Sequence, residues 1–274
     1  MPRVAVLIPC HGEGSLLAEA VASVQEDEDV EIVVVDDASP DEETKRVLDG
    51  LDARVIRLEE NIGVGRARTT AFEVSTAPYV YPLDADDLAI PGVLKRMADL
   101  LDADPGAAAC VGDVEEFGDA EVTRRTPPRL DPYRVALTNE FPVTAMFRRE
   151  PVAAVGAWRP YYEHPGYEDW NLWMGLAERG ERIIPLLAPA YRRRLHGERM
   201  NQIARARHAE RYAAMKRAHP KLFAELKEHR RNSDLPPLKK ALYPLVYGAR
   251  AEIPFERQIK PWFDRLGIWT RAAR

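Results

Sequence analysis

The chain has 274 residues, and 46% of them are apolar, which is enough for one large domain or a main domain with an appendage. This composition excludes a disordered protein. The two cysteines, Cys10 and Cys110, stand far apart in apolar runs, which excludes a disulfide framework and favours reduced core thiols. The net charge of −5 is uneven, because residues 188–274 hold 21 Lys and Arg against 8 Asp and Glu, whereas residues 1–187 hold 18 against 36.

Apolar strand-like runs and amphipathic stretches alternate through the first third of the chain. The expected strands are residues 4–9, 31–36, 54–58 and 79–83, and the expected helices are residues 16–25, 41–51 and 64–74. Because the strand runs are continuously apolar, we expect them to be buried on both faces in a parallel sheet with right-handed crossovers. Ligands of such sheets bind at the carboxyl ends of the strands.

The later part of the chain follows a mixed pattern. After an expected helix at residues 91–101, the expected strands are residues 107–112, 143–148, 183–187 and 190–195, with a Trp-rich helix beginning at Glu168 and ending near Gly180. A long charged helix is predicted from about residue 198 to residue 219, where Pro220 ends it, followed by helical pieces separated by prolines. We therefore expect an α/β domain over residues 1–197 and a basic, mainly helical extension over residues 198–274.

The basic C-terminal part predicts a partner that carries negative charge. Phospholipid headgroups or a lipid-linked phosphate are the favoured candidates. An ordinary solvated helical face explains the same residues equally well. Nucleic acid is not favoured, because no motif of a nucleic-acid-binding module is present. The apolar run at residues 4–8 is too short for a signal peptide, and no run approaches the roughly 18 apolar residues of a membrane span, so we expect a soluble or peripherally attached protein.

Three carboxylates follow the expected strand at residues 79–83, within the run Asp84-Ala85-Asp86-Asp87. Oxygen-rich clusters suit Mg²⁺ or Mn²⁺, and these ions commonly keep open positions for substrate phosphates. The run therefore predicts a metal site for a diphosphate-bearing ligand. The alternative is a polar turn in which Asp86 or Asp87 caps the following helix.

Two further motifs lie where strands are expected to end. Asp36 and Asp37 stand at the end of a strand and favour contact with a nucleobase or ribose, although turn and capping chemistry around Asp41 explains them equally well. The run 61–68 resembles a dinucleotide fingerprint but has Arg68 in place of the third glycine, which argues against a nicotinamide site. Its glycines suit close backbone approach, and Arg68 suits pairing with the acidic clusters or with phosphate. An ordinary glycine-rich start of a helix explains the run equally well.

Glu168 and Asp169 open the Trp-rich helix. Acidic residues in a first turn are favoured by the helix dipole alone, but a carboxylate beside aromatic side chains also suits a general base towards a sugar hydroxyl. Trp158, Trp170 and Trp173 are expected to be mainly core residues, with one or two in contact with a ligand. A lone histidine usually has no special role, but His196 follows an expected strand opposite an acidic cluster and suits a metal ligand or a phosphate contact.

Taken in order, these motifs resemble the inverting family 2 glycosyltransferases of GT-A fold, over residues 4–196. The residues that carry the resemblance are Pro9, Asp36-Asp37-Ala38-Ser39, Asn61-Ile62-Gly63 with Ala67-Arg68, Asp84-Ala85-Asp86-Asp87 and Glu168-Asp169-Trp170. The resemblance implies a mostly parallel, Rossmann-like sheet flanked by helices. It also implies transfer of a sugar from a nucleoside diphosphate sugar, with UDP favoured, to a hydroxyl of a glycan or lipid-linked acceptor.

The same resemblance assigns roles to individual residues. Asp169 is implied as the catalytic base, and Glu168 and Trp170 as acceptor contacts. The donor contacts are implied at Pro9, His11, Asp36, Asp37, Asn61, Gly63, Arg68, Asp84 and Ala85. Mg²⁺ or Mn²⁺ is implied at the DXD-type cluster through Asp86 and Asp87, with His196 as a further ligand. The family commonly has an aromatic residue and an asparagine after Pro9, where this chain has Cys10-His11-Gly12, so base stacking there either comes from His11 or is absent.

Two other classes of function satisfy similar demands. A nucleotidyltransferase acting on a sugar phosphate also needs a nucleotide-binding sheet and metal-holding acids, but the chain lacks an obvious glycine-rich N-terminal phosphate loop with a basic residue. A nucleotide-sugar sensor needs no catalytic acids, whereas every acid required for turnover is present. We expect an enzyme in the cytoplasm, with possible peripheral attachment to the inner face of the membrane.

Overall fold

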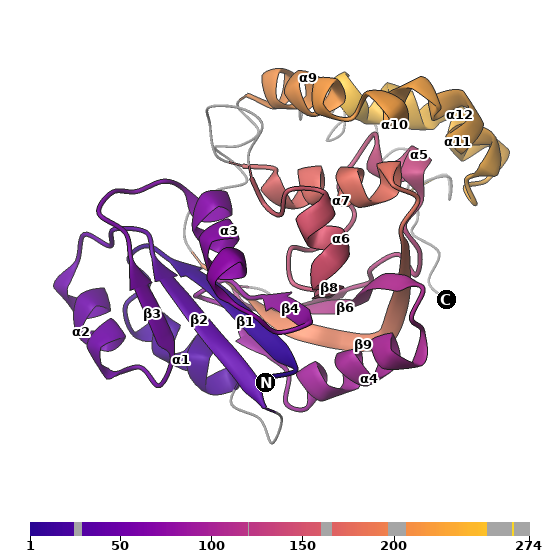
Figure 1. Cartoon of the computed structure of the whole chain (residues 1–274). Helices are drawn as coiled ribbons and strands as arrows, with labels where there is room; N and C mark the ends of the chain where they lie inside the picture. The colour runs from indigo at the N-terminus through magenta and orange to yellow at the C-terminus, as the bar shows by residue number, and fades with distance from the viewer. Residues whose placement is uncertain (25–28, 120, 160–165, 197–206, 251–264, 266–274) are drawn as a thin grey trace.

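The computed structural model describes residues 1–24, 29–119, 121–159, 166–196, 207–250 and 265. Its first part is the predicted alternation of strands and helices (Figure 1). In chain order the elements are β1 (Val4–Cys10), α1 (Ser15–Ser23), β2 (Val30–Asp36), α2 (Glu42–Gly50), β3 (Arg54–Arg57), α3 (Val64–Val74) and β4 (Tyr79–Pro82). The four strands pair in parallel in the order β3-β2-β1-β4, as predicted.

The central strands are buried on both faces, which explains their continuous apolar sequence. Ala5 and Leu7 of β1 pack in one core with helix α3, whereas Val4, Val6 and Ile8 pack in the other with helix α1. A parallel sheet needs helices on both faces, and the βαβ crossovers supply them. The cysteines are confirmed as free core thiols, and burial raises the pKa of each to about 12.

The second part of the sheet is mixed. It contains β5 (Leu88–Ala89), β6 (Ala107–Gly118), β7 (Val122–Arg124), β8 (Met146–Arg148) and β9 (Arg182–Leu195). Strand β8 joins the parallel strands to β6 by antiparallel pairing on both sides, and β6 runs parallel to β9. The two strands predicted at residues 183–187 and 190–195 are one strand, irregular where Leu187 has a positive φ of 56°.

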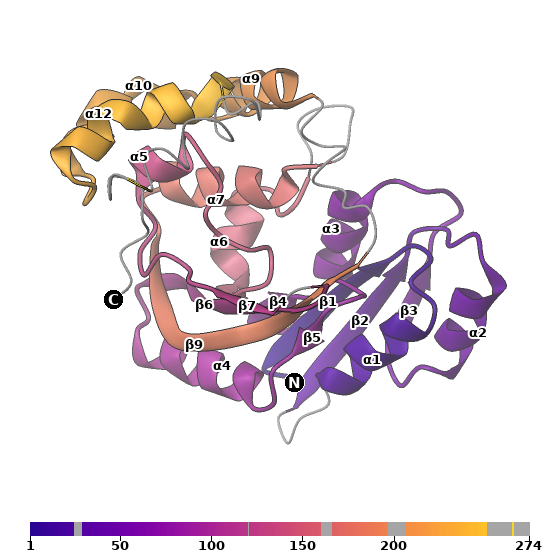
Figure 2. The same ribbon diagram turned by 180° about the vertical axis from the view of Figure 1, so that it is seen from behind.

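Helices α3, α6 (Arg149–Ala154) and α7 (Glu168–Glu178) cover one face of the sheet, and α1 and α4 (Val93–Ala103) cover the other (Figures 1 and 2). The short helix α5 (Pro132–Val135) packs against α7. Helix α4 begins after Gly92, which adopts the left-handed conformation. Asp86 and Asp87 therefore do not cap it, and the alternative reading of the acidic run as a helix cap is wrong.

The C-terminal helices form a further layer over α5 and α7, on the side away from the sheet (Figures 1 and 2). They are α9 (His208–Ala218), α10 (Pro220–Ala224), α11 (Leu226–Asn232), α12 (Pro237–Val246) and the 3₁₀ turn η1 (Gly248–Arg250). Tyr212, Met215 and Leu222 share the core of the α7 face. The predicted helix does end before Pro220, but residues 198–206 of that prediction lie outside the described residues. Within the described part of the chain, no helix combines the length and apolar content that a membrane span requires.

Gly65 allows the closest approach between α3 and the start of α7. A Cβ atom at this position would lie 2.7 Å from the carbonyl oxygen of Trp158, and still closer to Cγ of Glu168. These contacts fix α3, which carries Arg68, against α7, which carries Asp169. The glycine here serves close approach, as its place in the strand-to-helix motif predicted.

We expect Gly65→Ala to lower the free energy of unfolding by about 1–3 kcal/mol, because the added methyl group has no room between two backbones. Chemical denaturation measures the effect. Gly50→Ala is the matched control, since nothing lies within 4 Å of a Cβ at Gly50. An equally small change in the free energy of unfolding for both variants would show that α3 and α7 are not tightly packed at Gly65.

Candidate active site

The ends of three parallel strands meet at one edge of the sheet. Cys10 pairs with Asp36, and Leu7 pairs with Pro82. Backbone bonds extend both ladders by one residue, because the N–H of Asp37 donates to the carbonyl of Cys10 and the N–H of Leu83 donates to that of Leu7. His11, Asp37 and Asp84 consequently follow the ladder at the same edge, where ligands of such sheets bind.

The Asp36-Asp37 pair shapes the loops at this edge. Both residues are buried; Asp36 accepts from the N–H of Ser39 at 2.9 Å, and Asp37 accepts from the N–H groups of Ile62 and Gly63 at 2.7 and 2.8 Å. The predicted turn chemistry is therefore present, and the α2 cap is Asp41, which accepts from the N–H of Thr44. These contacts place the two loops beside each other.

His11, which follows β1, and Asn61, which precedes α3, are exposed beside these loops. The ring of His11 is held by a 2.8 Å contact between Nδ1 and the carbonyl of Asp37, while Asn61 Oδ1 accepts from the N–H of Gly63 at 3.1 Å. Gly63 has a positive φ of 89° and opens α3. Pro9 is buried within β1.

Arg68 joins α3 to the strand end that follows β4. Its Nη2 lies 2.6 Å from Oδ1 of Asp84, with the Arg68 side chain 4% exposed and that of Asp84 39% exposed. The Nε of Arg68 is buried and has no hydrogen-bond partner among the described residues. A guanidinium beside a strand end suits an anionic ligand.

Asp86 and His196 meet across the site. Nε2 of His196 lies 2.9 Å from Oδ2 of Asp86, and both side chains are partly exposed. The two residues are 110 positions apart in sequence and come from the ends of β4 and β9. Burial raises the pKa of Asp86, the charge of Asp84 raises it further, and the contact with His196 lowers it.

Asp87 points elsewhere. Its carboxylate is buried and accepts from the backbone N–H of Arg194 at 2.8 Å. Burial, together with the charges of Asp84 and Asp86, raises its pKa to about 9. The prediction of Asp87 as a metal ligand is not supported by this orientation, because the side chain fastens β9 to the acidic loop. Ala85 is also buried.

Asp169 lies in the first turn of α7 and is partly buried. Its Oδ2 accepts from Nδ2 of Asn139 at 2.8 Å. Burial raises the pKa of Asp169 to about 6; the charges of Glu168 and Asp84 add to the rise, and the N–H of Trp170 and the charge of Arg68 oppose it. Since Arg68 and Asp84 both act on Asp169, the base candidate lies within electrostatic reach of the acidic strand end.

Glu168 and Trp170 are turned into the protein. Glu168 is 5% exposed and accepts from the N–H of Gly166, and Trp170 is 4% exposed with its indole N–H donated to the carbonyl of Val135 at 2.6 Å. Trp158 and Trp173 are fully buried. The expected acceptor contacts from Glu168 and Trp170 are therefore corrected: both side chains position the turn that carries Asp169.

The metal-ligating side chains at this site fit a hard divalent cation only if a bound substrate supplies further oxygen ligands. No three His, Cys, Asp or Glu side chains in the described ranges are arranged to hold a metal by themselves. Asp86 and His196 do form an accessible pair beside the repelling charge of Asp84. Mg²⁺ and Mn²⁺ are commonly held by one or two carboxylates plus substrate phosphates, so this pair suits an ion that arrives with a diphosphate.

The structure adds two residues that the sequence did not indicate. Glu13 faces the acidic strand end: burial raises its pKa, the charges of Asp86 and Asp84 raise it further, and the N–H of His11 lowers it. Its position two residues after His11 was the available signal. Asn139 approaches Asp169 across 30 positions of sequence, and an isolated asparagine in an expected loop gave no signal for that contact.

Comparison with known families decides the class of the protein. The profile described as glycosyl transferase family 2 matches residues 5–156, which is more than half of the chain. The chain belongs to glycosyl transferase family 2. This result confirms the resemblance and the prediction of a glycosyltransferase enzyme.

Two curated relatives act in bacterial polysaccharide biosynthesis by name. The amylovoran biosynthesis glycosyltransferase AmsE of Erwinia amylovora is 27% identical over 165 residues, covering 57% of this chain and 61% of the relative. The succinoglycan biosynthesis protein ExoU of Rhizobium meliloti is 39% identical over 106 residues, covering 37% of this chain and 30% of the relative. The chain thus spans less than two thirds of the length of either relative.

Solved structures confirm the GT-A type of α/β fold. S. aureus TarS (residues 1–349) in complex with UDP-GlcNAc aligns with a TM-score of 0.65 at 18% identity, over 97% of this chain and 78% of that one. The mannosyltransferase PcManGT of Pyrobaculum calidifontis, in complex with GDP-Man and Mn²⁺, aligns with a TM-score of 0.59 at 21% identity, over 98% and 81%. The C-terminal helices are included in these alignments, since they cover nearly the whole chain.

The raised pKa of Asp169 predicts a pH-dependent cost in stability. The folded protein holds a proton between the ordinary pKa of 3.8 and the folded value of about 6, so stability falls as pH rises through this window. We expect Asp169→Asn to raise the melting temperature at about pH 8 and to lose this advantage below about pH 4. Scanning calorimetry across pH measures both.

Asp52→Asn, at an exposed turn, is the control for a general effect of removing one negative charge. An equal rise in melting temperature at about pH 8 for both variants would show that burial of Asp169 imposes no specific cost in stability.

Proposed function

We propose that the protein transfers a sugar from a nucleoside diphosphate sugar, with UDP favoured, to a hydroxyl group of a glycan or lipid-linked acceptor, with inversion at the anomeric carbon. The observation that carries this proposal is the position of Asp169. This carboxyl group, with a pKa of about 6, lies within the electrostatic reach of Arg68 and Asp84 at the strand ends. A base poised near neutral pH beside a phosphate-binding edge is what such a transfer requires. The names of AmsE and ExoU support a polysaccharide as the product.

The donor would lie over the ends of β1, β2 and β4. His11 is exposed and held at its Nδ1, so its ring suits stacking on the base. Pro9, Asp36 and Asp37 form the floor beneath it, and the run from Asn61 to Gly63 brings backbone close to the nucleotide. Asp84 would accept from a hydroxyl of the ribose or the donor sugar, while Arg68 neutralises Asp84 and faces the diphosphate. Ala85 keeps the loop between them small.

The acceptor hydroxyl would approach from the side of α7. Asp169 takes its proton as the oxygen forms a bond to the anomeric carbon, and the bond from that carbon to the diphosphate oxygen breaks on the opposite face, which inverts the configuration. Asp86 and His196 would hold the divalent cation, Mg²⁺ or Mn²⁺. Bound there, the cation supplies charge neutralisation for the departing diphosphate. Glu168 and Trp170 fix the helix turn that presents Asp169.

Two isosteric variants distinguish the role of the base from the role of the metal ligand. Asp169→Asn should lower turnover by roughly 10²–10⁴-fold, because the proton acceptor is lost, and should leave donor binding intact. Asp86→Asn should instead weaken the Mn²⁺-dependent binding of the donor. Titration calorimetry with UDP-GlcNAc, UDP-glucose and GDP-mannose, with and without Mn²⁺, measures binding, and release of nucleoside diphosphate measures turnover.

Three outcomes contradict the proposal. Release of pyrophosphate in place of nucleoside diphosphate would indicate a nucleotidyltransferase. Donor binding without any turnover towards glycan or lipid-linked acceptors would indicate a sensor. Full turnover by Asp169→Asn would remove this residue as the base.

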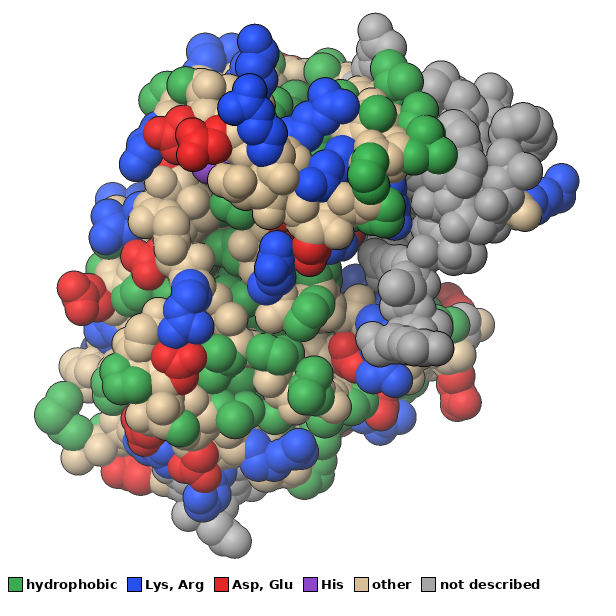
Figure 3. Space-filling view, turned by 90° about the vertical axis from the view of Figure 1, so that its right-hand side faces the viewer, with side chains coloured by type: hydrophobic (Ala, Val, Ile, Leu, Met, Phe, Trp, Pro, Cys, Tyr) green, Lys and Arg blue, Asp and Glu red, His purple; other side chains and the backbone are tan. Residues whose placement is uncertain are grey.

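We further propose that the protein works in the cytoplasm, with the C-terminal helices resting on an anionic membrane surface. Lys and Arg side chains gather over the upper part of the face in Figure 3, where these helices lie. Lys227, Arg230 and Arg231 are exposed on α11. Helix α12 exposes Leu238 and Leu245, which are 55% and 45% exposed and seven residues apart, so they lie on one side of the helix. Basic and apolar groups together suit an interfacial contact.

We expect the full chain to cosediment with vesicles that contain phosphatidylserine, and to be released by added salt, because each basic residue near the surface contributes about 1 kcal/mol. Arg230→Glu with Arg231→Glu should weaken the binding. Lys45→Glu with Arg46→Glu is the matched charge reversal on α2. Binding that ignores both lipid charge and salt would contradict the proposal.

A further inference from the structure

A hydrogen bond joins the base candidate to a segment from a distant part of the chain. Nδ2 of Asn139 donates to Oδ2 of Asp169 at 2.8 Å, and Oδ1 of Asn139 accepts from the N–H of Phe141 at 3.1 Å. The second contact fixes the orientation of the amide, because a flipped group would face both partners with the wrong atom. Asn139 therefore presents an N–H donor, and one carboxylate oxygen of Asp169 is already occupied.

We propose that Asn139 is the positioning residue of Asp169, holding Oδ2 so that Oδ1 is the oxygen that meets the acceptor hydroxyl. This inference rests on the proposed function, in which Asp169 is the base. The arrangement follows a general pattern, in which a base is oriented by a third group through its second polar atom. A misplaced base can cost on the order of 10²-fold in rate, so such a contact matters to turnover more than to binding.

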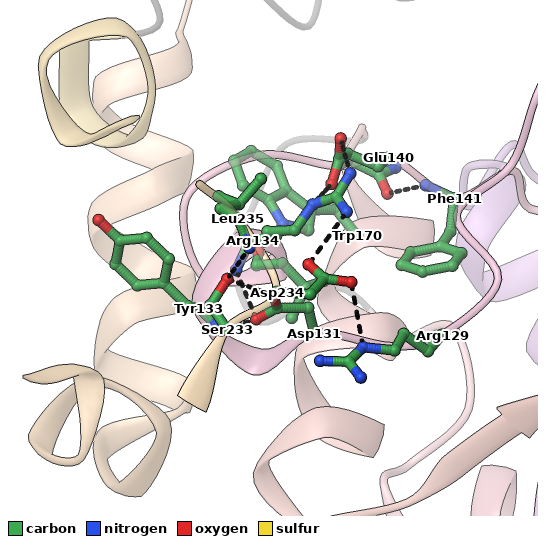
Figure 4. Close-up of polar contacts among 12 residues, drawn as sticks. Arg129, Asp131, Tyr133, Arg134, Glu140, Phe141, Trp170, Ser233, Asp234 and Leu235 are labelled. Atoms are coloured by element: carbon green, nitrogen blue, oxygen red, sulfur yellow. Dashed lines mark hydrogen bonds and ion pairs between the residues drawn. The ribbon is translucent and has the colours of Figure 1, made fainter. Parts of the chain in front are cut away.

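The segment that carries Asn139 is held in place by charged and polar contacts (Figure 4). Arg134 binds Glu140 through two hydrogen bonds of 2.5 and 2.6 Å, and the Arg134 side chain lies between Glu140 and Asp234. Asp131 caps α5 and accepts from the hydroxyl of Ser233 at 2.5 Å. The loop after α11 is thereby fastened to the start of α5, and Arg134 of α5 holds Glu140, the neighbour of Asn139.

The C-terminal helices also hold the backbone just before Asn139. The hydroxyl of Tyr212 in α9 donates to the carbonyl of Ala136 at 2.9 Å, and the N–H of Gly248 in η1 donates to the carbonyl of Leu137 at 2.8 Å. His208 connects this layer to the turn before Asp169. Its Nε2 lies 2.7 Å from the carbonyl oxygen of Gly248, and its Nδ1 lies 3.0 Å from the hydroxyl of Tyr167. One layer of helices thus braces both partners of the Asn139–Asp169 hydrogen bond.

The charged groups that act on Asp169 come from three elements, and Asn139 is uncharged among them. Glu168 of α7 and Asp84 after β4 oppose its ionised form, and Arg68 of α3 favours it. A donor to the carboxylate favours the ionised form as well. Replacing that donor with a negative group should therefore make Asp169 harder to ionise in the folded protein.

The discriminating variant is Asn139→Asp, which keeps an oxygen for the N–H of Phe141 and exchanges the donor for a like charge. We expect turnover to fall roughly 10–100-fold with the donor KM unchanged, and the acidic limb of the pH–rate profile to move to higher pH. Asn139→Ala should show a smaller shift of the limb. The assays use the full chain with Mn²⁺ and the better donor of UDP-GlcNAc, UDP-glucose and GDP-mannose, with melting temperatures measured alongside.

A merely structural asparagine would lower the melting temperature when replaced by alanine, but would leave the turnover of the folded enzyme at its pH optimum unchanged. An Asn139→Asp enzyme with wild-type turnover and an unmoved acidic limb would overturn the inference, and so would wild-type behaviour of Asn139→Ala should the Asp variant not fold. Asp169→Asn tells this failure apart from that of the proposed function. If Asp169→Asn is inactive and the Asn139 variants are normal, only the positioning role fails; if Asp169→Asn is fully active, the base assignment itself fails.

Discussion

The ion pair between Arg68 and Asp84 is the contact on which the site depends. It bridges α3 and the strand end after β4 at 2.6 Å, and the Arg68 side chain is 4% exposed. Taking one partner away would leave a charge in a poorly solvated place, which commonly costs about 3–5 kcal/mol for a buried pair. Asp84 is partly exposed, so the cost here is at the lower end. The same guanidinium favours the ionised form of Asp169 on α7, so one cation serves both sides of the site.

The site is electrostatically costly to fold. Glu13, Asp84, Asp86 and Asp87 converge on one edge of the sheet, and the charges of Asp84 and Asp86 raise the pKa values of their neighbours. Arg68 and Arg193 bring positive charge to these acids, and His196 contacts Asp86. Such crowding of like charges is typical of functional sites, where a ligand completes the balance. A carboxylate that faces away from the ligand is stabilised by a backbone N–H group, as the N–H of Arg194 stabilises Asp87.

The sequence predicted the fold of the first half well, because its signals are local. Strand runs buried on both faces are continuously apolar, and the motifs that end them fall at one edge whatever the details of packing. The second half was less predictable. The sequence predicted two strands with a break at residues 188–189, yet pairing with β6 carries β9 through this stretch and past the irregularity at Leu187.

Within the site, too, prediction failed where a residue's role depends on contacts between elements that are distant in sequence. The family resemblance implied Trp170 as an acceptor contact, but its indole N–H donates to the carbonyl of Val135 and its ring packs against Tyr212 of α9. Asp87 looked equivalent to Asp86, but only pairing with β9 decides which carboxylate turns outward. Asn139 was invisible because its role arises from contacts with α7 and from bracing by the C-terminal helices. Sequence spacing reports periodicity along an element, whereas these roles are set by which elements meet.

The account holds that a cation, the donor diphosphate and Asp169 share one site. Anomalous scattering from crystals grown with Mn²⁺ and a nonhydrolysable UDP-sugar analogue tests this claim directly. We predict a manganese peak between Asp86, His196 and the diphosphate, with the anomeric carbon of the sugar facing Asp169. A peak or a nucleotide away from Asp86, or a sugar that points away from Asp169, would contradict the account.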